Sequence, residues 1–263
     1  MNPTRIEPPF KCIFCNSNEN TFTSLEHIVP HSLGNNVLVM EKGWVCDTCN
    51  NICSAFESRV INHSLFGAER AMLGVITKKG KPARSKYGKL HWNAEPSMEK
   101  NVISIDKKEL NKAPIFSNKI IIPVHDKYNY DVAKLLLKIG VEILSKAYYK
   151  ESFLINKLSE AKKHIIKDDS AIWPYFVIRN NKIHEHIISI FESFPEKHKY
   201  ITSLGIDIFL QDVDDDIILF FFYGNFKVGI SLTSRAINWL QVLDYWRIAY
   251  VGCPIEFKNY SSV

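Results

Sequence analysis

The 263-residue sequence contains no run that approaches the roughly 18 to 20 uncharged apolar residues of a membrane-spanning helix. Its first residues, MNPTRIEPPFKC, lack the apolar stretch of a signal peptide. Internal repeats and low-complexity segments are also absent. These absences predict a globular protein of the cytoplasm without a membrane partner, and the 46% hydrophobic content is sufficient for a substantial core.

Cysteine is scarce, but four of the six cysteines occur in closely spaced pairs. The pairs are Cys12-x-x-Cys15 and Cys46-x-x-Cys49, with 30 residues between them. A reducing cytoplasm disfavours disulfides, so this spacing points to metal. Four thiolates from two such pairs fit a closed, tetrahedral site for a structural zinc ion. We expect Cys53 and Cys253 to be core thiols rather than ligands.

Acidic residues are missing from the segment KKGKPARSKYGK, residues 78–89. Residues 1–120 hold 16 Lys and Arg against 11 Asp and Glu, so the net charge of +5 belongs to the first half of the chain. The segment suits a phosphate backbone, whose binding is largely electrostatic, although a solvated hairpin tip has the same composition. Its basic residues are Lys78, Lys79, Lys81, Arg84, Lys86 and Lys89.

The hydrophobic pattern predicts an α+β fold. Short strands are expected at 25–29 and 37–40, and a helix from about Asn50 to Gly67. The later elements are a strand at 119–124, a long helix within 126–151, a helix at 152–167, a strand at 172–178 and a meander formed by IDIFL, IILFFFY and KVGISL. We divide the chain into a zinc-binding module at 1–70, a basic strand and turn extension at 71–125, and an α+β domain of unknown role at 126–263.

Three motifs between residues 10 and 60 together resemble the zinc-binding branch of the HNH endonuclease family. They are CIFC (12–15), SLEHIVPHSLGNN (24–36) and VCDTCNN (45–51). The combination is specific, whereas any one of them alone would be weak. The resemblance implies a ββα-metal fold, a hairpin followed by a helix, which holds a catalytic divalent cation separate from the zinc.

The resemblance also implies roles for individual residues. His27 matches the general base that activates water, and Asn35 matches the residue that orients the hairpin loop, with Asn36 as a close competitor. Glu26 and Asn50 match the ligands of the catalytic cation, and their oxygen atoms favour Mg²⁺ or Mn²⁺. Phosphodiester hydrolysis needs such a base, in its neutral form, and a cation that stabilises the developing charge.

Each of these roles has an alternative. Glu26 could instead hold His27 in its working tautomer, and Asn50 could simply cap the helix. His31 could contact the phosphate or the cation, or lie in a solvated loop. Asn51 and Glu57 are weaker candidates, and we expect Glu57 to be an exposed helix residue.

The sequence therefore predicts a metal-dependent endonuclease that acts on DNA, in a setting such as bacterial restriction or antiphage defence. The rival hypothesis is a non-catalytic zinc-knuckle module that binds nucleic acid or a protein. A latent nuclease subunit that a protein partner activates is a third possibility, and the C-terminal part could serve target selection, partner binding or homo-oligomer contacts.

Overall fold

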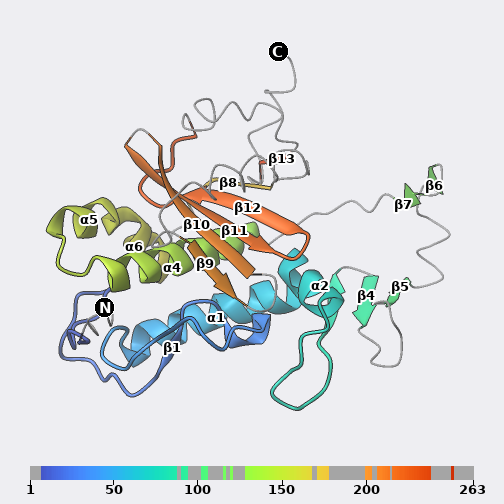
Figure 1. Ribbon diagram of the computed structural model, residues 1–263, viewed down its shortest axis with the longest axis horizontal. Coiled ribbons are helices and arrows are strands. Elements are labelled where there is room, and N and C mark those ends of the chain that lie inside the picture. The colour runs from blue at the N-terminus through green and yellow to red at the C-terminus, as the bar shows by residue number, and fades with distance from the viewer. Residues whose placement is uncertain are drawn as a thin grey trace.

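The computed structural model describes residues 7–87, 90–93, 102–105, 115–116, 119–120, 128–167, 171–177, 199–202, 206–213, 215–237 and 250–251. Helices and antiparallel strands are both present in these ranges, and they are largely segregated along the chain (Figure 1). The predicted α+β class is therefore confirmed.

The N-terminal module is a short hairpin followed by a helix. Strand β1 (Glu26–His27) pairs antiparallel with β2 (Val39–Met40), with Glu26 opposite Met40 and His27 opposite Val39. The connecting loop contains the 3-10 turn η1 (His31–Leu33), which ends at Gly34 with φ of 94°. Helix α1 (Asp47–His63) follows β2. This is the predicted ββα order, with strands shorter than the sequence pattern suggested.

The single helix predicted at 50–67 is divided into two helices at Ser64. Ser64 is extended, with φ of −117° and ψ of −179°, so its backbone ends α1. Its hydroxyl then accepts a hydrogen bond from the N–H of Phe66 at 3.1 Å, which caps α2 (Leu65–Met72). The hydrophobic pattern continues across the break, which is why it predicted one helix.

Helix α4 (Asn129–Ala147) lies at the centre of the molecule and confirms the predicted long helix. It contacts α1 on one side and strands β11 and β12 of the main sheet on another. Most of its residues are buried, 14 of 19, as expected for a helix that is apolar around most of its circumference. The predicted helix at 152–167 forms two short helices, α5 (Ser152–Lys157) and α6 (Ser159–Ile166).

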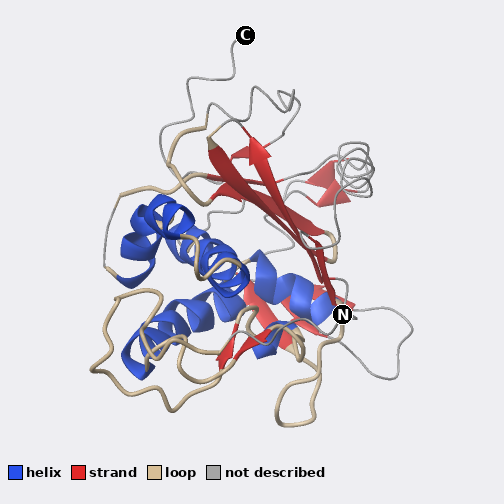
Figure 2. Cartoon of the chain, turned by 60° about the vertical axis from the view of Figure 1, so that its left-hand side comes forward, coloured by secondary structure: helices blue, strands red, loops and turns tan. Residues whose placement is uncertain are grey.

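The main sheet is antiparallel and has the strand order β13-β8-β12-β11-β10-β9. Figures 1 and 2 show this sheet on one side of the helical layer that contains α4. The predicted meander is confirmed in β10, β11 and β12. The strands are β8 (Tyr175–Val177), β9 (Lys199–Thr202), β10 (Ile206–Val213), β11 (Asp216–Tyr223), β12 (Phe226–Ser231) and β13 (Tyr250–Val251).

Two smaller sheets occupy the segment between α2 and α4. One contains β3 (Arg84–Tyr87), β4 (Leu90–Asn93) and β5 (Val102–Ile105), and α2 contacts its first two strands. The other pairs β6 (Ile115–Phe116) with β7 (Lys119–Ile120), which is the start of the strand predicted at 119–124. The rest of that predicted strand lies outside the described residues, as does Cys253.

One continuous hydrophobic core joins the N-terminal module to the later elements. It contains the buried cysteines and Trp44, apolar residues of α1 and α4, and the inner face of the main sheet. The module therefore rests on α4, while the proposed domain boundaries remain predictions. No helix in the part of the chain that the structure describes has the length and apolarity needed to cross a bilayer.

Candidate functional site

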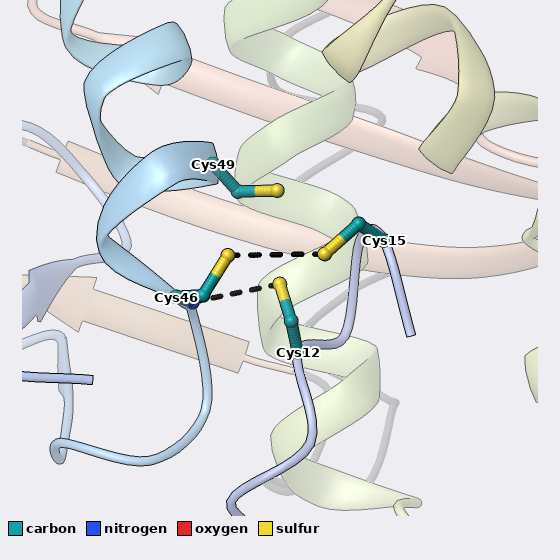
Figure 3. Close-up of side chains that lie close together, drawn as sticks. All are labelled: Cys12, Cys15, Cys46 and Cys49. Atoms are coloured by element: carbon teal, nitrogen blue, oxygen red, sulfur yellow. Dashed lines mark hydrogen bonds between the residues drawn. The ribbon is translucent and has the colours of Figure 1, made fainter. Parts of the chain in front are cut away.

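The four paired cysteines converge at one point. Figure 3 shows Cys12 and Cys15 approaching from the N-terminal loop, and Cys46 and Cys49 from the start of α1. All four sulfur atoms lie within 4.8 Å of one another, and the Sγ atoms of Cys15 and Cys46 are 3.8 Å apart. Tetrahedral zinc with Zn–S bonds of about 2.3 Å requires sulfur separations of about 3.8 Å. The cluster therefore fits a zinc ion in both ligand type and geometry.

Backbone contacts bring the two cysteine pairs together. The Asn16 N–H donates to the Cys12 carbonyl at 2.9 Å and closes the first turn, and the Ile13 N–H donates to the Trp44 carbonyl at 3.0 Å. Hydrogen bonding from Cys49 lowers the pKa of Cys12 to about 4, and the same contact raises the pKa of Cys49. Binding of a divalent cation requires the cysteines in their thiolate form, and this hydrogen bond favours that form at Cys12.

His27 stands at the end of β1 and is half-buried. Its Nδ1 atom is buried and has no hydrogen-bond partner among the described residues, and the His31 ring lies edge-on with centroids 5.4 Å apart. Burial lowers the pKa of His27, and the nearby charges of His31, Lys138 and Lys78 lower it further. The imidazole is therefore neutral near pH 7, which is the form that a general base requires.

Asn35 organises the loop that follows β1. Its Nδ2 group donates to the carbonyls of Val29, at 2.6 Å, and Leu38, at 2.8 Å. Its Oδ1 atom accepts from the N–H groups of Val37, at 3.0 Å, and Leu38, at 2.8 Å. Asn35 is fully buried and Asn36 is exposed, so the loop-orienting contacts belong to Asn35.

Glu26 points away from solvent into a charge cluster that the sequence analysis did not anticipate. Its Oε1 atom lies 2.6 Å from the Nζ atom of Lys138, a fully buried residue of α4. Glu57 and Glu142 complete the cluster, with carboxylate oxygens 2.9 Å and 3.2 Å from the same Nζ atom. Burial alone would lower the pKa of Lys138, but the three carboxylates raise it well above its usual value, so the amine stays protonated.

This cluster corrects one expectation. Glu57 was predicted to be an exposed helix residue, and its side chain is only 15% exposed because it pairs with Lys138. The signal that could have revealed the cluster is the Lys138 and Glu142 pair at i and i+4 within the otherwise apolar run LLLKIGVEIL. Charges are rarely buried unless they are paired, so a partner from another element was to be expected.

Asn50 lies in the first turn of α1 and is half-buried. The N-cap of this helix is Cys46, so the alternative in which Asn50 caps the helix is wrong. Its side-chain amide makes no hydrogen bond among the described residues, and the Oε2 atom of Glu26 is also unpartnered there. Within these residues the Asn50 side chain therefore keeps an oxygen atom without a partner, whereas the Oε2 atom of Glu26 is buried and burial raises the pKa of this carboxyl group.

The cysteine cluster is the only group of at least three Cys, His, Asp or Glu ligand atoms close enough together for a metal within the described ranges. A cation at Glu26 and Asn50 would thus have few ligands from the protein. Mg²⁺ is commonly bound in this way, through one or two carboxylates together with water and substrate phosphates.

The basic segment begins in a turn beside the site. The Thr77 N–H donates to the Lys81 carbonyl at 2.8 Å, and the N–H of Gly80, which has φ of 68°, donates to the Thr77 carbonyl at 2.9 Å. The residues whose side chains the structure describes are exposed: Lys78, Lys79, Lys81 and Arg84. Lys78 is near enough to contribute to the lowered pKa of His27. The Lys86 side chain and all of Lys89 lie outside the described part of the chain.

Comparison with known proteins supports the resemblance. Residues 12–65, which contain both cysteine pairs, the hairpin, all of α1 and the first residue of α2, match the family model of the HNH endonucleases. No curated protein and no solved structure matches the chain. The segment that carries the cysteine cluster and His27 thus matches the HNH endonuclease family, while the remaining residues have no counterpart in these comparisons.

Proposed function

Because residues 12–65 match the HNH endonuclease family, we propose that this protein is a metal-dependent endonuclease that hydrolyses phosphodiester bonds in DNA. The observation that carries the proposal is the state of His27. Its imidazole is neutral and half-buried, so part of the ring reaches solvent, and it stands at the end of a strand whose following loop is fixed by Asn35. A residue in this position can accept a proton from water.

The cysteine cluster would hold a structural zinc ion, and Glu26 and Asn50 would hold a separate Mg²⁺ or Mn²⁺ ion. When bound, the latter supplies positive charge that stabilises the phosphoryl oxygens and the leaving oxygen. Lys138 engages the Oε1 atom of Glu26 and the Oε2 atom is buried, so this role requires the Oε2 atom to turn toward the substrate. His27 would take the proton of the attacking water, and the fixed loop would hold the imidazole in place.

The basic turn supports a nucleic acid as the substrate. Lys78, Lys79, Lys81 and Arg84 are exposed on one turn and the strand that follows it, without an acidic residue between them. Contacts from such side chains to phosphates position a duplex without reading its sequence. The family resemblance further suggests bacterial restriction or antiphage defence as the setting, in a reducing cytoplasm where the four cysteines stay available for zinc.

Cleavage of supercoiled plasmid by zinc-loaded protein tests this proposal. The protein is first dialysed free of other metals, and then Mg²⁺ or Mn²⁺ is titrated in while bound zinc and DNA binding are measured in parallel. We expect nicked and linear DNA to appear only with the added cation, at unchanged zinc content. DNA binding without cleavage at any cation concentration would contradict the nuclease and favour the non-catalytic binding module.

A further inference from the structure

The ammonium group of Lys138 is surrounded by oxygen atoms from three different parts of the chain, namely residues 26–28, α1 and α4 itself. Besides the three carboxylates, its Nζ atom donates to the carbonyl of His27 at 2.7 Å and lies 3.4 Å from the carbonyl of Ile28. The side chain is 0% exposed. A single residue of α4 therefore contacts Glu26, the backbone of His27 and the next peptide group.

A second lysine on the same helix holds the other strand of the hairpin. Lys146 donates to the carbonyl of Val39 in β2 at 2.8 Å and lies 3.3 Å from a carboxylate oxygen of Glu41. Its side chain is 37% exposed, in contrast to that of Lys138. Helix α4 thus attaches to both strands, and the buried attachment is the one at His27.

The hairpin needs such an attachment because it is too short to hold its own geometry. The sheet consists of β1 and β2 alone, with two residues in each strand. An isolated two-stranded hairpin is marginally stable at best in water. The contacts of Lys138 lie on both sides of the His27 Cα atom, through Glu26 before it and the His27 carbonyl after it, so they fix the backbone from which the imidazole projects.

A contribution to the stability of the fold does not by itself explain why these four charged groups are buried together. Burying an ammonium group and three carboxyl groups carries a large desolvation cost, and well-packed apolar residues of similar volume often stabilise a core equally well. A rigid network of charge-assisted hydrogen bonds, in contrast, holds its members in one geometry. The location of the cluster against the predicted general base favours this second use.

We propose that Lys138 is a positioning residue for His27, so that α4, which lies outside the segment that matches the HNH family, is part of the nuclease site. The proposal rests on the proposed function. A displacement of about 1 Å at a reacting group can cost about 10²-fold in rate, so loss of the attachment should lower the cleavage rate without removing DNA binding.

The test compares Lys138→Met with Lys146→Met. Both substitutions keep an unbranched side chain and remove an ammonium group of α4 that binds a hairpin carbonyl. We expect Lys138→Met to lower kcat about 10²-fold, with KM, zinc content and the DNA dissociation constant within about twofold of wild type. Backbone amides at 26–29 should exchange hydrogen at least about tenfold faster. Lys146→Met should keep kcat and the exchange at 26–29 close to wild type.

A second variant guards against misfolding, because Lys138→Met leaves three carboxyl groups buried without their cation. Lys138→Met combined with Glu142→Gln removes one of those charges on α4 and leaves the hairpin residues untouched. The same loss of kcat in this folded, zinc-loaded protein supports the proposal. Wild-type kcat together with wild-type exchange at 26–29 in either variant would overturn it. Loss of zinc binding and DNA binding in both variants would also overturn it, because Lys138 would then serve only the stability of the fold.

The hydrogen-exchange measurement separates this inference from the proposed function. If wild-type protein cuts no DNA, the nuclease assignment fails, while faster exchange at 26–29 in Lys138→Met still shows that Lys138 fixes β1. If wild-type protein cuts DNA and Lys138→Met cuts equally well, only the positioning role fails.

Discussion

Asn35 and Asn36 are adjacent residues of the same type in very different environments. Asn35 is buried and makes four hydrogen bonds to the backbone of its own loop, whereas Asn36 is exposed. We predict that Asn35→Ala lowers the free energy of unfolding by roughly 2 to 4 kcal/mol, because it leaves backbone groups at 29, 37 and 38 unpaired. Asn36→Ala should change it by less than about 0.5 kcal/mol.

Urea denaturation of the two zinc-loaded variants measures this difference. Asn35→Ala should also lower DNA cleavage, since the loop that follows His27 loses its fixed geometry, while Asn36→Ala should cleave normally. Equal stability of the two variants would show that Asn35 does not organise the loop.

At the residue scale, the sequence pointed to Glu26, His27 and Asn35 as candidate site residues but not to the residues that hold them in place. Glu26, His27 and Asn35 are identifiable because their spacing belongs to a short local motif. Lys138 is not, since the contact to His27 spans 111 positions and no local pattern relates the two. Glu57 was misjudged for the same reason, because its partner lies on another helix.

At the scale of elements, the cysteine cluster connects the N-terminal loop to the start of α1. Cys46 is the N-cap residue of this helix and Cys49 lies in its first turn. We predict that Cys46→Ser abolishes stoichiometric zinc binding, because one ligand of the tetrahedral set is lost. The protein should then unfold at a lower temperature, since the free energy of metal binding no longer stabilises the folded state.

Cys53→Ala is the matched control for this prediction. Cys53 is buried one turn farther along α1, near Glu57 and Lys138 and outside the four-sulfur cluster. Its replacement should leave the zinc content, measured by mass spectrometry or a chromogenic chelator, equal to that of wild type. Loss of zinc from Cys53→Ala but not from Cys46→Ser would contradict the assigned ligand set.

The basic turn between α2 and β3 gives a prediction about DNA binding. Replacing Lys79, Lys81 and Arg84 with Ala should weaken binding at low salt and reduce the slope of log K against log salt concentration by up to about 3. The control variant replaces three exposed basic residues in or next to α5 and α6, namely Lys150, Lys163 and Lys167. Both variants lose the same formal charge.

Fluorescence anisotropy of a labelled duplex across a salt series distinguishes the two variants. A reduced slope in the turn variant, with the control near wild type, supports a contact with phosphates at this turn. The same slope in both variants would instead mean that the exposed lysines form only a solvated tip.

The boundaries of the elements were the least predictable feature at this scale. The hydrophobic spacing continues through Ser64, so it predicted one helix at 50–67. A serine that caps a following helix does not interrupt that spacing, and the break was therefore missed. The strands β1 and β2 are shorter than the apolar runs around them, because only two residues in each strand pair. The meander was easier to predict, since turns separate its long apolar strands.

At the scale of the whole molecule, the sequence predicted the α+β class but not the way in which its parts meet. A division at residue 126 treats the long helix as the start of a separate unit, whereas α4 packs against α1 and holds both hairpin strands. In the sequence, only the charged pair Lys138 and Glu142 within the apolar helix α4 indicates that arrangement. It can be interpreted only once the hairpin is placed beside the helix.

The central claim is that His27 acts as the base of a metal-dependent nuclease. It is tested most directly by the single-turnover rate of plasmid cleavage by His27→Ala compared with His63→Ala. His63 lies exposed at the end of α1, where it stacks on Tyr128 with ring centroids 5.2 Å apart. Both proteins are purified identically and loaded with zinc, and Mg²⁺ or Mn²⁺ is added.

We predict that His27→Ala cuts about 10² to 10⁴-fold more slowly than wild type, because general-base catalysis is lost. Its zinc content, fold and DNA affinity should be retained, and His63→Ala should cut at the wild-type rate. Cleavage by His27→Ala at the same rate as wild type would contradict the account, since the base would then lie elsewhere or the activity would come from a contaminant.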